Sequence, residues 1–162
     1  MVDKIIKASD LPNQGAYTVV GTYDHHELLR LVTNLSKFTN IPVKDLETVY
    51  GKHLFQCLVS RYGSLISLKQ SFFEFLNSVD NHIHVEVRKL YPEAELPRFK
   101  CTLVDENTLN MEYRSSRPFA DLAEGLILGC ADHFGEKIHL SKKSSKENEE
   151  NVVQFCIQKE AP

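Results

Sequence analysis

The hydrophobic period of this chain changes once, around Pro92 and Pro97, and that change constrains the fold more than any other feature. Before it, apolar residues recur every three or four positions, as in DLETVYGKHLFQCLVSRY, whereas after it they alternate with polar ones, as in RFKCTLVD. Helices have a period of 3.6 residues and strands a period of two. Because no low-complexity linker or internal repeat separates the two portions, the sequence predicts one α+β domain over residues 1–162.

Three helices are expected in the first portion. Asp24 is a candidate N-cap for a helix through HHELLRLVTNLSKF, and a second helix, through DLETVYGKHLFQCLVSRY, should end at Gly63. Ser67 and Gln70 are spaced as a capping box before a long amphipathic run that should stop before Pro92. Part of that run, HIHVEV, also alternates like a strand, an alternative that its helical flanks disfavour.

The later portion predicts a hairpin, a helix and two further strands. The hairpin covers RFKCTLVDENTLNMEYRS and turns around Asp105, Glu106 and Asn107, and the helix covers FADLAEGLILGCADHF. The strands are KIHLS and VVQFCIQ, and the tract between them, KKSSKENEEN, reads as a charged loop or hairpin tip.

Charge and hydropathy exclude several classes of function. With 22 acidic against 19 basic residues and no dense Lys/Arg cluster, no nucleic-acid partner is expected. The N-terminus has no signal-peptide core and no stretch is long enough to span a bilayer, so a cytoplasmic protein without membrane insertion is expected.

Ser115, His84 and the cysteines could be cast as nucleophile and base, but without a nucleophile elbow, phosphate loop or paired-carboxylate motif no enzyme is expected.

The four cysteines, at 57, 101, 130 and 156, are far apart and form no CxxC pair. Cys57 and Cys130 lie inside apolar helical patterns, which favours buried thiols over disulfides or a structural zinc site.

His84 is the first candidate for chemistry. On a helix it shares a mainly apolar face with Phe73, Asp80, Val87 and Tyr91. A histidine in such a place is either a core residue with satisfied hydrogen bonds or a ligand, and both interpretations stay open on this evidence. His82 would point about 200° away around the same helix.

The second candidate is the pentapeptide Y-x-S-x-R. Tyr113, Ser115 and Arg117 would lie on one face of an extended segment, because alternate strand residues point the same way. Two hydroxyl donors and a guanidinium suit a carboxylate ligand. An ordinary polar strand face is the alternative.

Together these residues resemble the signature of the H-NOX (haem-nitric oxide/oxygen binding, HNOB) family, which includes the sensory domain of soluble guanylate cyclase. His84 precedes Tyr113 by 113 − 84 = 29 residues, matching the family spacing, and the likeness continues through HIHVEVRKLYPEAELPRF, NMEYRSSRPF and LAEGLILGCADHF. It implies the H-NOX fold, in which a helical N-terminal part packs with a C-terminal antiparallel sheet and helices around a haem pocket.

The resemblance also implies the roles of individual residues. His84 would be the axial ligand of the iron of a ferrous haem b, Tyr113, Ser115 and Arg117 would hold the propionates, and Pro97 would press on the porphyrin. Leu122 stands where oxygen-binding members carry a tyrosine that donates a hydrogen bond to oxygen. A sensor of nitric oxide that excludes oxygen is therefore expected.

Signalling by a bacterial two-component system is a further implication of the resemblance. Nitric oxide would weaken the bond between iron and His84, the helix carrying His84 would move, and a histidine kinase or diguanylate cyclase would respond. Family members usually carry a further helix before the region where Met1 falls, so an N-terminally short domain is expected. Some relatives hold zinc, but the matching stretch here offers only Cys156, and no zinc is expected.

The alternative function is a haem-free or weakly haem-binding module. It would regulate a partner kinase or cyclase by surface contacts or by oxidation of Cys57 or Cys130.

Overall fold

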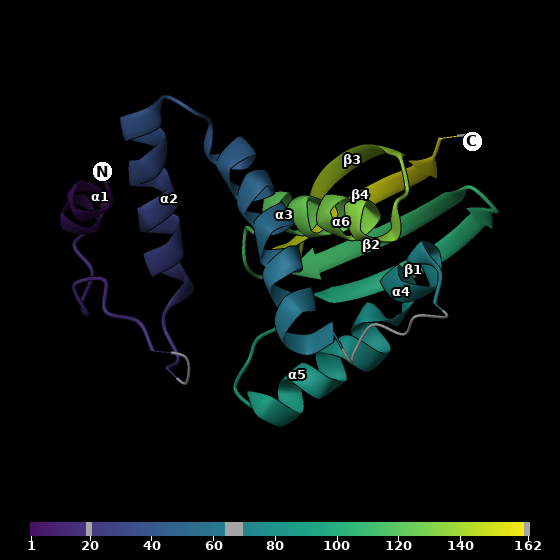
Figure 1. Ribbon diagram of the computed structural model, residues 1–162, viewed down its shortest axis with the longest axis horizontal. Coiled ribbons are helices and arrows are strands. Elements are labelled where there is room, and N and C mark those ends of the chain that lie inside the picture. Colours follow the sequence, from purple (N-terminus) through teal and green to yellow (C-terminus); the bar gives the residue numbers. More distant parts are fainter. Residues whose placement is uncertain (19–20, 64–69, 161–162) are drawn as a thin grey trace.

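The computed structural model describes residues 1–18, 21–63 and 70–160, which form a helical first part and a later part of four strands and one further helix (Figure 1). The elements are α1 (Val2–Ser9), α2 (His25–Thr39), α3 (Val43–Tyr62), α4 (Phe72–Ser78), the π-helical turn η2 (Val79–Ile83), α5 (His84–Leu90), β1 (Arg98–Asp105), β2 (Thr108–Ser115), α6 (Ala120–Phe134), β3 (Ile138–Glu147) and β4 (Glu150–Lys159). All four of these strands follow Pro97, so the α+β organisation predicted from the change of period is confirmed.

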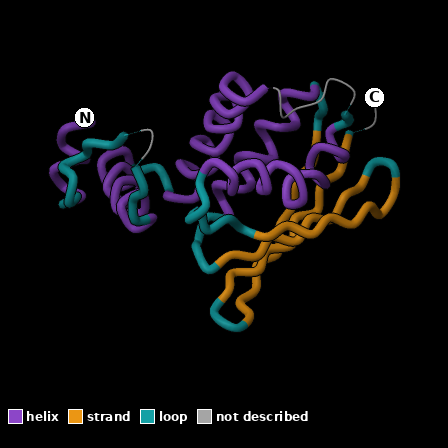
Figure 2. Tube along the Cα trace, turned by 90° about the horizontal axis from the view of Figure 1, so that it is seen from below, coloured by secondary structure: helices purple, strands orange, loops and turns teal. Residues whose placement is uncertain are grey.

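The strands form one antiparallel sheet in the order β1-β2-β4-β3. Figure 2 shows the helices after the first two gathered on one of its faces. Alternate residues of β2 and β4 point into the core toward those helices, with Met111 opposite Phe155 and Leu109 opposite Ile157. These side chains are at most 2% exposed, which is the alternation expected of a sheet with one buried face.

Helices α3 and α6 cross so closely that their backbones meet at glycines. A Cβ atom on Gly51 would lie 2.9 Å from the Cα of Gly125, and a Cβ atom on Gly125 would overlap the carbonyl oxygen of Thr48. Real Cβ atoms do not approach so closely, so the crossing requires residues without side chains at both positions.

The run α4–η2–α5 is helical throughout, as its period predicted, and the alternative strand over HIHVEV is wrong. Its capping box is formed by Ser71 and Glu74, whose side chains each accept a hydrogen bond from the other's backbone N–H. Ser67 of the box predicted from the sequence lies outside the described residues. The π-helical turn ends directly before His84, and such turns are frequent at functional sites.

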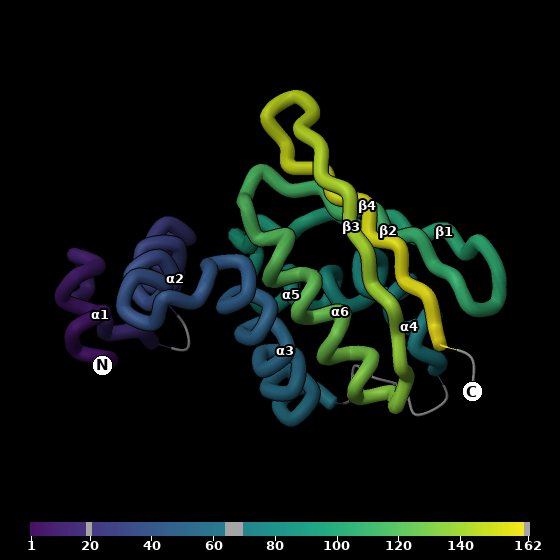
Figure 3. The backbone as a smooth tube through the Cα atoms, turned by 90° about the horizontal axis from the view of Figure 1, so that it is seen from above, coloured from purple at the N-terminus to yellow at the C-terminus, as the bar shows by residue number. Residues whose placement is uncertain are grey.

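Helices α1 and α2 pack on one another at one end of the molecule, away from the sheet (Figure 3). The amide of Asn34 donates to the carbonyl of Ala8 at 3.1 Å, and Arg30 donates to the carbonyl of Asp10 at 3.2 Å. The α2 helix begins after Asp24, whose side chain accepts from the backbone N–H of His26, so the predicted N-cap is confirmed.

One local expectation is wrong, and one that the sequence left open is decided. The side chain of Cys57 is exposed, because the apolar period of α3 turns this position away from α6, whereas Cys130 is buried as predicted. Of the two alternatives for the tract KKSSKENEEN, the hairpin tip is confirmed, since β3 continues to Glu147 and β4 begins at Glu150 after a turn at Asn148 and Glu149.

No helix in the described ranges is both long and apolar enough to cross a membrane.

The α3–α6 crossing yields a stability prediction. Gly125→Ala should lower the free energy of unfolding by about 1–3 kcal/mol, because the added methyl group would push against the α3 backbone. Gly63→Ala is the matched control, since a Cβ at Gly63 meets no atom of the described residues within 4 Å, and it should change stability little. Denaturant unfolding measures both; equal effects of the two variants would contradict the close crossing.

Candidate functional site

The two candidate groups from the sequence are brought together through Phe99. The imidazole of His84, at the start of α5, lies 5.7 Å from the Phe99 ring, centroid to centroid. The Phe99 ring in turn lies 5.7 Å from that of Tyr113, and the two residues are direct partners in the β1–β2 ladder. The three rings therefore form one continuous group across α5, β1 and β2.

His84 is buried, with 9% of its surface exposed. Its Nδ1 lies 3.5 Å from Oδ1 of Asp80, too long for a good hydrogen bond, and Asp80 accepts instead from the Phe99 backbone N–H at 3.3 Å. Among the described residues this Nδ1 has no hydrogen-bond partner. Burial lowers the pKa of His84 more than the Asp80 carboxylate and the Pro97 backbone raise it. The imidazole is therefore neutral, the form that binds metals.

The Y-x-S-x-R residues converge by a route that differs from the prediction. Tyr113 and Ser115 lie in β2, but the strand ends at Ser115, so Arg117 is not on the same extended segment. A bend brings it back: the Arg117 backbone N–H donates to Oγ of Ser115 at 3.0 Å, and the Tyr113 hydroxyl donates to the Arg117 carbonyl at 3.3 Å. Local hydrogen bonds, rather than strand alternation, hold the three residues together.

The guanidinium of Arg117 retains capacity for a further acceptor. Its Nη2 lies 2.9 Å from Oε2 of Glu95, a side chain that is 70% exposed, and its Nε is buried without a hydrogen-bond partner in the described ranges. An ion pair with so exposed a carboxylate is weak, and a bound carboxylate could replace it. Pro97 lies half-buried between Glu95 and the first residue of β1.

Burial also raises the pKa of the Tyr113 hydroxyl, which keeps it protonated and able to donate. The donors at this end of the site are thus a phenol, a serine hydroxyl and a guanidinium. Together with the neutral imidazole of His84, they fit a group that combines a metal ion with carboxylates, such as an iron porphyrin with its propionates.

Leu122 lines a mainly apolar cavity of about 190 Å³ between α1, α2, α3 and α6. Its wall includes Leu28, Leu31, Leu46, Phe119 and one charged residue, Glu47. Leu122 on α6 and the carboxyl group of Glu47 on α3 therefore lie in the wall of the same cavity.

Sequence reasoning missed Glu47. Its side chain is only 7% exposed, and burial raises its pKa to about 7; the neighbouring carboxylate of Asp121 raises it further, while Lys142 lowers it. The signal was present in the spacing, because Glu47 precedes Gly51 and Phe55 by four and eight residues and so belongs to the buried stripe of α3.

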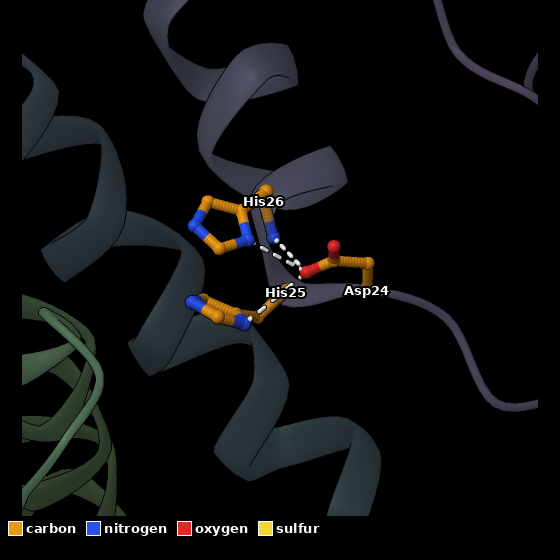
Figure 4. A group of neighbouring side chains, drawn as sticks. All are labelled: Asp24, His25 and His26. Carbon is orange, nitrogen blue, oxygen red and sulfur yellow. Dashed lines mark hydrogen bonds and ion pairs between the residues drawn. The ribbon is translucent and has the colours of Figure 1, made fainter.

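Another polar cluster stands at the start of α2 (Figure 4). It is the one place in residues 1–18, 21–63 and 70–160 where three possible metal ligands meet: the ligand atoms of Asp24, His25 and His26 lie within 4.8 Å of one another. Oδ1 of Asp24 lies 2.8 Å from Nδ1 of His26 and accepts from its backbone N–H at 2.9 Å, which lowers the pKa of Asp24. Asp24 and His26 are exposed, and helix capping accounts for this arrangement.

Comparison with known proteins supplies the context for this site. The sequence profile of the haem-NO-binding family (HNOB) matches residues 1–142. The crystal structure of an Fe(II) unliganded H-NOX protein from K. algicida has 39% sequence identity and a TM-score of 0.92, covering 99% of this chain and 86% of that one. An H-NOX protein from S. oneidensis, solved in the Fe(II)NO ligation state, has 27% identity and a TM-score of 0.88, covering 98% and 88%.

Soluble guanylate cyclase gcy-35 of Caenorhabditis elegans is a more distant relative. It is 26% identical over 119 residues, which are 71% of this chain and 17% of the cyclase. This chain thus spans only a small part of that protein's length.

The buried carboxyl of Glu47 predicts a pH-dependent stability. The folded chain holds this proton up to about pH 7, whereas the unfolded chain releases it near the ordinary value of 4.5. Folded protein therefore binds more protons between these values, and the free energy of unfolding should fall as the pH rises through this window. Glu47→Gln removes this loss, which amounts to at most about 3 kcal/mol by pH 8.

Denaturant unfolding of both proteins at pH 5, 6, 7 and 8 checks this prediction. The free energy of unfolding of Glu47→Gln, relative to that of the natural chain, should increase at each step. A difference that stays constant with pH would show that Glu47 titrates normally in the folded protein.

Proposed function

The chain belongs to the haem-NO-binding, or H-NOX, family of haem-based gas sensors, and on that premise we propose that it binds nitric oxide at a ferrous haem b whose iron is held by His84. The observation that carries the proposal is the state of His84. It is a buried, neutral imidazole with no hydrogen bond to Nδ1 from the described residues, in ring contact through Phe99 with the residues suited to propionates.

Each remaining residue has a part in holding the cofactor. Arg117 would bind a propionate with the guanidinium that now pairs with exposed Glu95, and Tyr113 and Ser115 would donate from their hydroxyls. Pro97, at the start of β1, would press on the porphyrin. When bound, ferrous haem supplies an iron atom that takes a diatomic gas as ligand. Zinc has no part in the proposal.

Leu122 supports nitric oxide rather than oxygen as the ligand. Bound oxygen is polar and gains from a hydrogen-bond donor, whereas nitric oxide on ferrous iron needs none. The leucine side chain offers no donor to the cavity that it lines. The S. oneidensis relative, solved in an Fe(II)NO state, is consistent with this choice.

Signalling would use the α5 helix. The π-helical turn before His84 leaves the helix locally less regular, so a change at His84 can shift α5 relative to α4. Val85, Leu90 and Tyr91 on and beside α5 are at least 40% exposed and offer an apolar surface to a partner. We propose a histidine kinase or diguanylate cyclase of a bacterial cytoplasm as that partner, the sensor having no catalytic activity of its own.

One observation favours the haem-free alternative, in which oxidation of a thiol regulates the partner. Cys57 is exposed and its Sγ lies 3.4 Å from Nε2 of His53, so an oxidant can reach it. Cys130 is unsuited to that role, because burial raises its thiol pKa and keeps it protonated.

Replacement of the proposed ligand tests the sensor. Ferrous His84→Gly, reconstituted with haem, should lose the absorption spectrum of a histidine-ligated iron while staying folded. His82→Gly, an exposed histidine two residues away, is the control and should match the natural protein. Unchanged ligation in His84→Gly would refute the assignment, and a stable oxygen complex of the natural protein at pH 8.5 would refute its selectivity for nitric oxide.

The propionate site gives a second prediction. Arg117→Ala should weaken haem binding about 10- to 150-fold, since one charge-assisted hydrogen bond is worth about 1.5–3 kcal/mol. Arg98→Ala, which removes a surface arginine paired with Glu150, should leave the affinity unchanged. Haem titration followed by absorption measures both. Equal affinities of the two variants would show that Arg117 does not touch the cofactor.

A further inference from the structure

Glu47 and Leu122 face the same cavity from different helices. Glu47 comes from the second turn of α3 and Leu122 from the first turn of α6. No side chain in the described ranges forms a hydrogen bond with the Glu47 carboxyl, although only 7% of this residue is exposed. Its oxygens are not fully enclosed by protein, so this partly desolvated acid meets whatever occupies the cavity.

The charged groups around Glu47 do not supply a partner. On α6, Asp121 is an acid, and on β3 the amine of Lys142 already pairs with both Asp121 and Glu124. On β2, Tyr113 is protonated. The wall contributed by α1 and α2 is apolar, with Ile5, Leu28, Leu31, Val32 and Leu35.

Two other polar side chains lie near this wall. Tyr50, one turn after Glu47, lines the cavity and is itself 45% exposed. His25 packs edge-on against Phe119, a residue of the cavity wall, with ring centroids 6.0 Å apart, so it is the imidazole to replace in a control variant.

We propose that Glu47 sets which diatomic gas the site holds, by offering a hydrogen-bond donor to the cavity when protonated and a negative charge when ionised. This inference rests on the proposed function, because it requires haem with its gas-binding side toward Leu122. It assigns to Glu47 the polar role that Leu122 cannot fill. The carboxyl is suited to both states, since its pKa lies at about 7.

The chemistry gives the direction of the effect. Oxygen on ferrous iron carries partial negative charge, so a protonated carboxyl attracts it and a carboxylate repels it. Nitric oxide on ferrous iron is much less polar and responds less. Selectivity for nitric oxide should therefore be strongest above pH 7 and decline as the pH falls and Glu47 takes up a proton.

Carbon monoxide is the probe for the test, because the C–O stretching frequency of its ferrous complex falls beside a donor and rises beside a negative charge. In the natural protein the frequency should decrease as the pH is lowered from 8.5 to 5.5, with a midpoint near 7. In Glu47→Gln, whose amide is a hydrogen-bond donor at every pH, the C–O frequency should stay low throughout this range. In Glu47→Leu the frequency should stay at one intermediate value. His25→Gln, the control, should titrate like the natural protein.

A ¹³C NMR titration of the side-chain carboxyls in haem-free protein supplies a readout that does not need the cofactor. One resonance should titrate near pH 7 and be missing in Glu47→Gln. If that resonance titrates near 4.5, or if the C–O frequency of the natural protein does not change with pH, the inference is wrong while the sensor stands. A chain that takes up no haem overturns the proposed function, and this inference with it.

Discussion

The pairing of Phe99 with Tyr113 across β1 and β2 is the contact on which the site depends. It fixes the Phe99 ring between Tyr113 and His84, so that the sheet positions the helix residue proposed to bind iron and the residues proposed to bind propionates relative to one another. The same ladder contributes the Phe99 N–H that donates to Oδ1 of Asp80, the oxygen that lies 3.5 Å from Nδ1 of His84. A shift of one residue in this register would turn Phe99 to the opposite face and separate the two halves of the site.

Burial then determines the chemistry of the titratable groups. His84 and Glu47 both lose most of their contact with water, but the effects on their pKa values have opposite signs, because the charged form of histidine is the protonated one and that of glutamate the ionised one. Both groups are pushed toward neutrality. For His84 this leaves a nitrogen lone pair for a metal, and for Glu47 it leaves a carboxyl that can change its charge near physiological pH.

Much of the architecture could be predicted because it follows local rules. The apolar periods gave the helices and strands, and the capping residue Asp24 gave the start of α2. Periodicity could not show that Arg117 returns to Ser115 through a bend, since that depends on hydrogen bonds formed after the strand ends. Nor could it show the burial of Glu47, which depends on α6 packing against α3 at Gly51 and Gly125. The likeness of His84 and Y-x-S-x-R to the H-NOX signature predicted the family correctly, whereas the roles of these residues stay predictions.

The central claim is that His84 holds the iron of a ferrous haem and that nitric oxide acts on this bond. Resonance Raman spectroscopy of the reconstituted ferrous protein, before and after addition of nitric oxide, addresses it most directly. The account predicts an iron–histidine stretching band that disappears when nitric oxide binds. Absence of the band from ferrous protein that retains its haem after desalting, or its persistence unchanged with nitric oxide bound, would contradict the account.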